Sequence, residues 1–477
     1  MHNLFHQALL QNFGYPPTKN QLTVVGELTD FVFLKLKKHL FVLKGYAGTG
    51  KTSLVGALVK TLPQINFDSV LLAPTGRAAK VLSIYANKPA FTIHKMIYQL
   101  SNGGDGYTRF VLKQNKFQNT IFLVDEASMI GDGGGLTSSN WGENKSLLDD
   151  LLEFVYAGIN CKLILIGDTA QLPPVGMDVS PALDEEFLRN SYHLNIELNE
   201  LSEVVRQEKD SEILTNATYL RDKIAFNNVD FPLFNSINKD DVKQISGLEL
   251  EDELNDAYTK FGEDNVMLIT RSNKNANLYN LQIRARIKWL EDEIASGDYM
   301  MIVKNNYYWL EDSSKAGFIA NGDIVEILKI RGIEELYGFK FANVTVRMID
   351  YPDEKELEVK ILMNSILSES PSLPSDRFRQ LYDAVAEEYD YEPNRKKRNE
   401  LIRKNPYYQA LQVKFAYAIT CHKSQGGQWD AVFIDQGYLT DEMINVEYLR
   451  WLYTAITRAK KELFLVNFSE QFFQLSS

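Results

Sequence analysis

Short apolar runs alternate with longer amphipathic stretches between residues 40 and 167. Each run has the length of a buried strand, and the stretches between the runs have helical periodicity. This alternation is typical of a parallel sheet with helices on both faces. The predicted strands lie in HLFVLKG (39–45), SVLLAP (69–74), TIFLVDE (120–126) and KLILIGD (162–168).

A second alternating region predicts a second α/β lobe. Its apolar runs are NVMLIT (265–270), KFAYAIT (414–420), DAVFID (430–435) and KELFLVNF (461–468). We therefore expect a first lobe over residues 1–200 and a second lobe over 201–296 and 407–477, each with a parallel sheet.

Residues 297–406 interrupt the second lobe with a different pattern. Three β-like segments are separated by Gly and Asn turns, and a charged, helix-like stretch follows over 375–403. This pattern predicts a small β-barrel with a helical extension. A smaller insertion over 99–119 contains GGDG between segments that can pair as a β-hairpin.

The composition is that of a globular protein with more than one domain. The 477 residues carry a net charge of −12, so any nucleic-acid groove has to be local rather than a wholly basic surface. Two cysteines, Cys161 and Cys421, exclude a disulfide scaffold and a cysteine-rich metal site. We expect no signal peptide, no membrane span and a cytoplasmic location.

A phosphate-binding loop follows the first strand. GYAGTGKT (45–52) matches GxxxxGK[ST] in the required strand–loop–helix context, which predicts a nucleoside triphosphate as a ligand. Backbone N–H groups and the helix N-terminus would surround the phosphates, Lys51 would reach the β- and γ-phosphates, and Thr52 would hold Mg²⁺. The predicted ATP contacts are Gly45, Tyr46, Ala47, Gly48, Thr49, Gly50, Lys51, Thr52 and Ser53.

Two further strand ends carry polar residues suited to hydrolysis. In FLVDEAS (122–128), we expect Asp125 to bind Mg²⁺ through water and Glu126 to polarise the attacking water. In GDTAQLPPVG (167–176), Asp168 and Gln171 precede a stiff diproline, so Gln171 is a candidate for reporting the γ-phosphate state.

Two arginines could meet the γ-phosphate from a second lobe. They are Arg206 in LSEVVRQ and Arg458 in YTAITRAKK. An arginine at this position accelerates phosphoryl transfer by about 10³–10⁵-fold. Spacing alone does not distinguish either residue from an ordinary surface charge.

Eight motifs occur in the order found in superfamily 1 helicases. They are GYAGTGKT, LLAPTGRAAK, TIHKMIY, VDEAS, GDTAQLPPVG, LSEVVRQ, AITCHKSQGGQWD and YTAITRAKK. The chain resembles the RecD-like and Dda-like branch, whose members have two RecA-like lobes and move 5′ to 3′ on single-stranded DNA. The resemblance implies that Gln21 reads adenine, that Gln171 senses the γ-phosphate, and that Arg206 and Arg458 are arginine fingers.

The same motifs offer donors for a DNA strand. Thr75 and the helix that begins at Gly76 could hold a phosphate, and Gln425 and Gly426 match a motif that faces both nucleotide and strand. Further candidate strand contacts are Thr92, His94, Thr420, His422, Lys423 and Ser424. His94 and His422 could equally be satisfied packing residues.

Two inserted segments each have more than one interpretation. The predicted hairpin resembles the strand-separating pin of the branch in position, with Tyr107 and Phe110 as candidate wedge residues or as an ordinary packing pair. Residues 365–406 match no motif, so gripping DNA, bracing the pin and docking a partner all stay open. An NKxD pattern in 237–241 lacks a preceding strand and is a poor guanine-binding site.

The sequence therefore predicts a monomeric, ATP- and Mg²⁺-dependent DNA helicase acting on single-stranded and tailed duplex DNA. A translocase that displaces proteins and a RecD-like motor subunit of a recombination complex use the same ATPase parts. A nucleotide-switched binding module and an RNA substrate are further alternatives.

Overall fold

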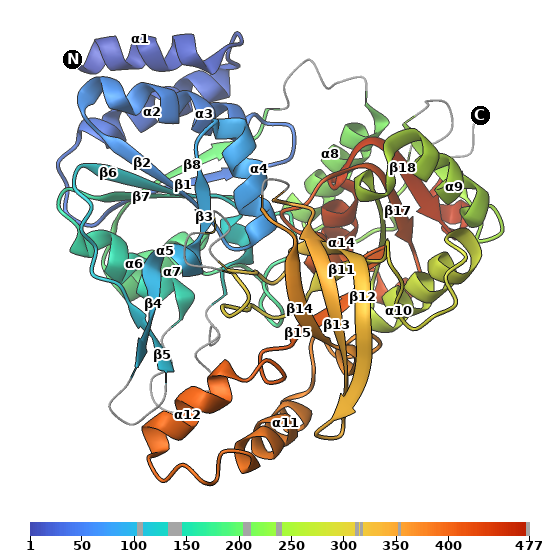
Figure 1. The fold of residues 1–477 in the computed structure, drawn as a ribbon. Coiled ribbons are helices and arrows are strands. Elements are labelled where there is room, and N and C mark those ends of the chain that lie inside the picture. Colours follow the sequence, from blue (N-terminus) through green and yellow to red (C-terminus); the bar gives the residue numbers. More distant parts are fainter. Residues whose placement is uncertain are drawn as a thin grey trace.

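Two parallel sheets flanked by helices, and a closed β-barrel, make up the fold in a computed structural model of the chain (Figure 1). The α/β fold class predicted from the apolar runs is confirmed. The structure describes residues 1–102, 108–131, 146–203, 211–234, 241–310, 314, 318–351 and 354–473. No helix among these residues combines the length and the apolar character that a membrane span needs.

The first sheet has six parallel strands in the order β3-β2-β6-β7-β1-β8. Four of these strands are the predicted apolar runs, and β6 and β7 are buried along their whole length, as central strands covered on both faces are. The strands are β1 (His39–Gly45), β2 (Asp68–Ala73), β3 (Ala90–Thr92), β6 (Thr120–Val124), β7 (Lys162–Gly167) and β8 (Asn195–Leu201).

Helices cover both faces of this sheet. Along β1, Phe41 and Leu43 pack with the helices α1, α2 and α3, whereas Leu40 and Val42 pack on the opposite face with α6. Because all strands run parallel, β1, β6 and β7 end at the same edge. The helices of this lobe are α1 (His2–Phe13), α2 (Lys19–Phe33), α3 (Lys51–Thr61), α4 (Gly76–Ala86), α5 (Ile93–Ile97), α6 (Leu147–Ala157) and α7 (Glu185–Tyr192).

The second sheet is parallel, with strand order β16-β10-β17-β18-β9. Its strands are β9 (Val242–Ile245), β10 (Val266–Thr270), β16 (Ala418–Thr420), β17 (Trp429–Asp435) and β18 (Ala459–Val466). The helices of this lobe are α8 (Glu212–Ala225), α9 (Leu250–Phe261), α10 (Asn273–Gln282), α13 (Cys421–Ser424) and α14 (Val446–Ile456).

Five strands close the inserted barrel, and two helices extend from it (Figure 1). The strands are β11 (Tyr299–Ile302), β12 (Ile324–Leu336), β13 (Phe339–Met348), β14 (Leu357–Leu362) and β15 (Leu411–Phe415). The helices α11 (Ser375–Glu387) and α12 (Arg395–Lys404) lie between β14 and β15 in the chain.

The single strand expected over residues 414–420 is wrong. Residues up to Phe415 belong to β15, which pairs with β11 and β14 of the barrel, whereas Ala418 begins β16 of the second sheet. The buried Asn280 explains the break, because its side chain accepts from the N–H groups of Tyr417 and Ala418 and donates to the carbonyls of Phe415 and Ala418.

A β-hairpin lies within the insertion predicted over 99–119. Strands β4 (Tyr98–Asn102) and β5 (Thr108–Leu112) pair antiparallel. Tyr107 lies outside the described residues, and for Phe110 only the position in β5 is described. The use of this hairpin as a pin stays a prediction.

Candidate nucleotide site and strand channel

The backbone conformation of the phosphate-binding loop depends on two glycines. Gly48 and Gly50 have φ angles of 73° and 87°, in the left-handed region that favours glycine. Helix α3 begins at Lys51, and its first turn has no side-chain cap. The N–H groups of this turn are therefore available to an anion, as in other phosphate loops.

Lys51 is folded back onto the loop. Its ammonium donates to the carbonyl oxygens of Gly45 (2.6 Å) and Tyr46 (2.8 Å). A β-carbon at Gly45 would lie 3.0 Å from the Lys51 side chain, so a larger residue there would crowd the lysine. The phosphate oxygens of a nucleotide would offer Lys51 acceptors in place of these two carbonyls.

Gln21 is tied to the same loop. Its amide donates to the carbonyl of Thr49 (2.9 Å) and accepts from the N–H of Thr18 (2.9 Å), and the residue is 3% exposed. The structure therefore gives Gln21 a role in holding the loop, beside the adenine contact that the resemblance implies.

Two acids lie at the end of β6, next to the loop. The carboxylate of Asp125 accepts from the N–H of Glu126 (2.9 Å), and Glu126 has a φ of 54°. Burial raises the pKa of Glu126 to about 7, although the charge of Arg458 opposes the shift. Burial also raises the pKa of Asp125, and the Lys51 ammonium opposes that shift. A base with a pKa near neutrality suits water activation.

Mg²⁺ fits the donors at this edge. The Thr52 hydroxyl and the Asp125 carboxylate are hard oxygen ligands, and Mg²⁺ at nucleotide sites takes one or two such ligands together with phosphate oxygens. Among the described residues no group of three or more His, Cys, Asp or Glu side chains lies close enough to hold a metal alone.

A buried glutamine, Gln171, follows the end of β7. Gln171 is 7% exposed, and its Oε1 has no hydrogen-bond partner among the described residues. The nitrogen and oxygen of a glutamine amide exchange by a half-turn, so either atom can meet a phosphate oxygen or a water. An unsatisfied buried amide is costly, and a ligand at this edge would satisfy it.

Three hydrogen bonds join this segment to the second lobe. The first is donated by the Tyr453 hydroxyl, on α14, to Asp168 (2.6 Å). The same hydroxyl also accepts from the N–H of Ala47 in the phosphate loop (3.0 Å). Leu172 makes the other two. The N–H of Leu172 donates to the Thr454 hydroxyl (2.8 Å), and its carbonyl accepts from Gln425 (2.8 Å).

Sequence reasoning missed Tyr453 and Thr454. Both lie in YTAITRAKK, but a buried tyrosine in an amphipathic helix looks like ordinary core packing. Only the three-dimensional approach of α14 to β7 reveals what the two hydroxyl groups bind.

Of the two arginines, Arg458 is described and Arg206 lies outside the described residues. Arg458 is 4% exposed and donates to the carbonyls of Thr454 (3.0 Å) and Gly427 (3.2 Å). Its charge acts on the pKa of Glu126, so it lies close to the predicted hydrolytic acids.

A cation that the sequence did not indicate also approaches the loop. The guanidinium of Arg221, on α8 of the second lobe, lies 4.8 Å from the centre of the Tyr46 ring. It also donates to the carbonyl of Ser202 (3.2 Å).

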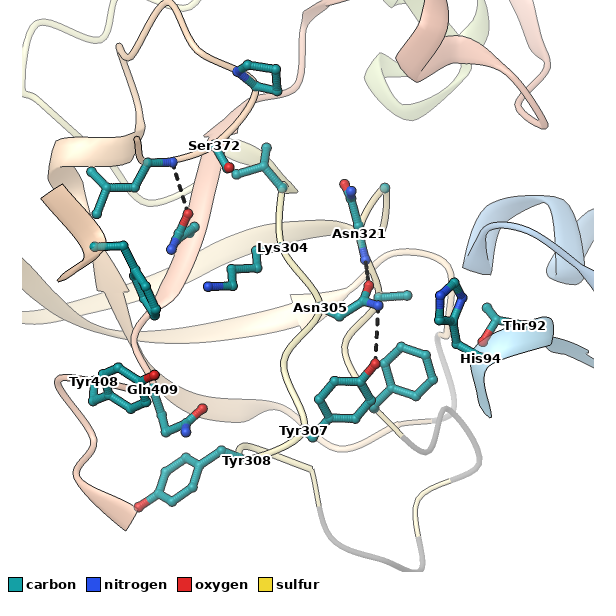
Figure 2. Close-up of a pocket in the computed structure, with 18 of the residues that line it drawn as sticks. Thr92, His94, Lys304, Asn305, Tyr307, Tyr308, Asn321, Ser372, Tyr408 and Gln409 are labelled. Carbon is teal, nitrogen blue, oxygen red and sulfur yellow. Dashed lines mark hydrogen bonds between the residues drawn. The ribbon is translucent and has the colours of Figure 1, made fainter. Parts of the chain in front are cut away.

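A cavity of about 1410 Å³ brings predicted strand contacts from both lobes together. Figure 2 shows Thr92 and His94 of the first lobe on one side of it, across from the barrel residues. The predicted contacts that line the cavity are Thr75, Thr92, His94, His422, Lys423 and Gln425. We call this cavity the strand channel.

The other predicted strand contacts do not line the channel. Ser424 is buried, and its hydroxyl donates to the Cys421 carbonyl (2.7 Å). Thr420 precedes α13 at the end of β16. Gly426 has a φ of 73°, and a β-carbon on it would lie 2.7 Å from the β-carbon of Ala78, so this glycine allows the second lobe to approach α4.

Gly76 faces the barrel. A β-carbon at Gly76 would lie 2.5 Å from a carboxylate oxygen of Asp323, and burial raises the pKa of Asp323 to about 8. Next to it, the Arg77 guanidinium lies 4.1 Å from the centre of the Trp429 ring. The α4 terminus predicted to hold a phosphate thus contacts an acid that sequence reasoning did not single out.

The fold and the site define a class of protein. Two parallel α/β lobes carry a glycine phosphate loop on one side and a buried arginine on the other, with two acids between them. This is the arrangement of a two-lobed P-loop ATPase.

Comparisons with known proteins give the family. Residues 30–231 match the AAA domain family, and residues 415–466 match the UvrD-like helicase C-terminal domain. The ATP-dependent DNA helicase dda of enterobacteria phage T4 is 26% identical over 91% of this chain and 95% of its own length. The chain is an ATP-hydrolysing helicase with an AAA domain and a UvrD-like helicase C-terminal domain, and it is similar to superfamily 1 helicases, as its motifs predict.

Further relatives cover different shares of the chain. The ATP-dependent RecD2 DNA helicase of Deinococcus radiodurans is 33% identical over 29% of this chain and 16% of its own length. An uncharacterized protein of Acanthamoeba polyphaga mimivirus is 24% identical over 94% of this chain and 98% of its own. A crystal structure of Pif1 helicase from Bacteroides with ADP-AlF3 and ssDNA covers 97% of this chain and 95% of its own, at 16% identity and a TM-score of 0.47.

Proposed function

We propose that this protein is an ATP-dependent DNA helicase that moves 5′ to 3′ on single-stranded DNA and unwinds tailed duplexes. One observation carries the proposal: Gln425 both lines the strand channel and donates to the Leu172 carbonyl, one residue beyond Gln171. A movement of Gln171 at the γ-phosphate would therefore reach the strand through the hydrogen bond between Leu172 and Gln425. The direction rests on the family.

Each residue of the nucleotide site has a role in this proposal. Lys51 binds the β- and γ-phosphates, Thr52 and Asp125 would hold Mg²⁺, and Glu126 takes a proton from the attacking water. Bound Mg²⁺ would supply charge stabilisation of the phosphates. Arg458, together with Arg206, stabilises the charge that develops on the transferred phosphoryl group.

Gln171 links hydrolysis to movement. Its amide reports the presence of the γ-phosphate, and loss of that contact shifts the segment that Tyr453, Thr454 and Gln425 attach to the second lobe. The two lobes then move relative to each other, and their grips on the strand alternate. We further propose that the motor works as a monomer in the cytoplasm.

Two measurements test the proposal. Single-stranded DNA should raise the ATPase rate, and no rise would refute a DNA motor. Partial duplexes with a 5′ or a 3′ tail should be unwound only from the 5′ tail, and preference for the 3′ tail would refute the direction. Stimulated ATPase without unwinding of either substrate would instead indicate a translocase that displaces proteins.

A further inference from the structure

The helical extension lines the same channel as the predicted strand contacts of the two lobes. Residues of α11 and α12 line the cavity together with Thr92 and His94 of the first lobe. Figure 1 shows these two helices as a pair that projects from the barrel. The basic residues of these helices that line the cavity are Arg379, Lys396, Arg403 and Lys404.

The extension is tied to a predicted strand contact. The Lys423 ammonium donates to the carbonyl of Pro371 (3.4 Å), in the linker that leads from β14 to α11. The N–H of Leu373 in the same linker donates to Gln412 of β15 (3.0 Å). The linker is therefore held against the second lobe and the barrel, and it positions α11 at the channel.

Lys304 extends into this channel (Figure 2). Among the described residues no carboxylate forms an ion pair with it, and its ammonium lies 3.5 Å from the centre of the Phe378 ring on α11. Burial lowers the pKa of Lys304 to about 8, as expected for an ammonium away from water and counter-charge. An anion in the channel would supply the missing partner.

Aromatic side chains also line this channel. Tyr308 is 39% exposed and lines the channel, and its ring meets that of Trp309 edge to face at 4.9 Å, which keeps the tyrosine ring in place. Figure 2 shows Tyr308 and Tyr408 on the same side of the channel as Lys304. An ammonium and an exposed aromatic ring that line one channel are the two kinds of group that single-strand binders use for a phosphate and a base.

We propose that Lys304 and Tyr308 form a further single-stranded DNA site, in which Lys304 binds one backbone phosphate and Tyr308 stacks on a base. The helices α11 and α12 line the same channel, so they form part of the wall around this site. This inference rests on the proposed function, because it requires that the strand pass through the channel.

The test compares Lys304→Gln with Lys329→Gln, using a fluorescent oligothymidine and binding measured over a range of salt. Lys329 is an exposed lysine on β12 that does not line the channel, so it matches the charge change. Loss of one phosphate contact should lower the slope of log affinity against log salt by about 0.7 for Lys304→Gln only. We expect the affinity to fall several-fold.

Tyr308 has a separate signature. Tyr308→Leu should weaken binding by about fivefold or more with an unchanged salt slope, because stacking does not release counterions. Tyr308→Phe keeps the ring and should restore binding. Thermal unfolding of each variant shows that the fold is retained.

The outcomes separate the two proposals. If wild-type protein neither binds the oligonucleotide nor gains ATPase activity from it, the proposed function fails and this inference fails with it. If wild-type protein responds to DNA but Lys304→Gln matches Lys329→Gln in slope and affinity, only the inference is overturned.

Discussion

Glu126→Gln should lower turnover and raise stability at the same time. The change keeps the size of the side chain and removes a carboxylate whose pKa burial raises to about 7. A neutral amide cannot accept the proton of the attacking water, so we expect turnover to fall by about 10²–10⁴-fold. ATP binding should be retained, because Lys51 and the loop N–H groups are unchanged.

The stability effect follows from the same pKa. The folded-state value of about 7 lies above the ordinary value of 4.5, so the folded protein favours the protonated acid. Stability from this group is therefore full below pH 4.5 and is lost as the pH rises through about 7. At pH 8 the charge costs about 3 kcal/mol, and at pH 5 it costs less than about 1 kcal/mol.

Glutamine has no such penalty, so the advantage of Glu126→Gln should grow with pH. Differential scanning fluorimetry at pH 5 and pH 8 measures it, with each kcal/mol corresponding to about 2–4 °C for domains of 150–250 residues. Glu27→Gln, at an exposed acid on α2, is the matched control and should show no such trend. A gain in stability that is equal at both pH values would refute the assignment of the raised pKa to Glu126.

Wild-type turnover gives an independent check. If the Glu126 carboxylate is the base, kcat/KM for ATP, which depends on the pKa values of the free enzyme, should be about tenfold lower at pH 6 than its plateau, which it should reach above pH 8. A kcat/KM that is flat between pH 6 and pH 8 would mean that another group accepts the proton or that a different step limits it.

Three further variants probe the nucleotide site. Lys51→Ala should lower ATPase turnover by at least about a hundredfold while salt-dependent DNA binding is kept, and near-normal turnover would rule out the phosphate-loop assignment. Gln171→Ala should reduce the base pairs unwound per ATP more than it reduces ATP affinity; equal losses would make Gln171 a binding residue. Tyr453→Phe removes the hydrogen bond to Asp168, which is worth about 1.5–3 kcal/mol. Because this bond joins the two lobes, its loss should raise the radius of gyration in solution scattering and lower the ATPase rate. Unchanged values of both would show that the lobes are held by other contacts.

The parts of the fold that were predictable from sequence are those fixed by local pattern. The strands β1, β2, β6 and β7 are buried on both faces, so their residues are almost all apolar and stand out from the helices between them. The phosphate loop was predictable for a related reason, since Gly48 and Gly50 adopt the left-handed φ angles that its spacing of glycines implies.

The parts that were missed depend on residues far apart in the chain. The break between β15 and β16 is held by Asn280, which lies 138 residues before Ala418. The close approach of Asp323 to Gly76 depends on how the barrel sits against the first lobe. No local pattern records either contact, so the sequence alone predicted one continuous strand and an open helix terminus.

The peptide groups of Leu172 attach the segment that carries Gln171 to the second lobe. On one side of Leu172, the Gln171 amide is buried at the nucleotide edge with an unpaired oxygen. The Leu172 N–H and carbonyl are both bound by the second lobe, through Thr454 and Gln425, and Pro173 and Pro174 follow. Because the prolines restrict φ on the far side, the proposed movement of Gln171 toward a γ-phosphate would be transmitted to these two hydrogen bonds rather than absorbed by the loop. Gln425 also lines the strand channel, so in the proposed function a single peptide and one side chain would connect the nucleotide to the strand.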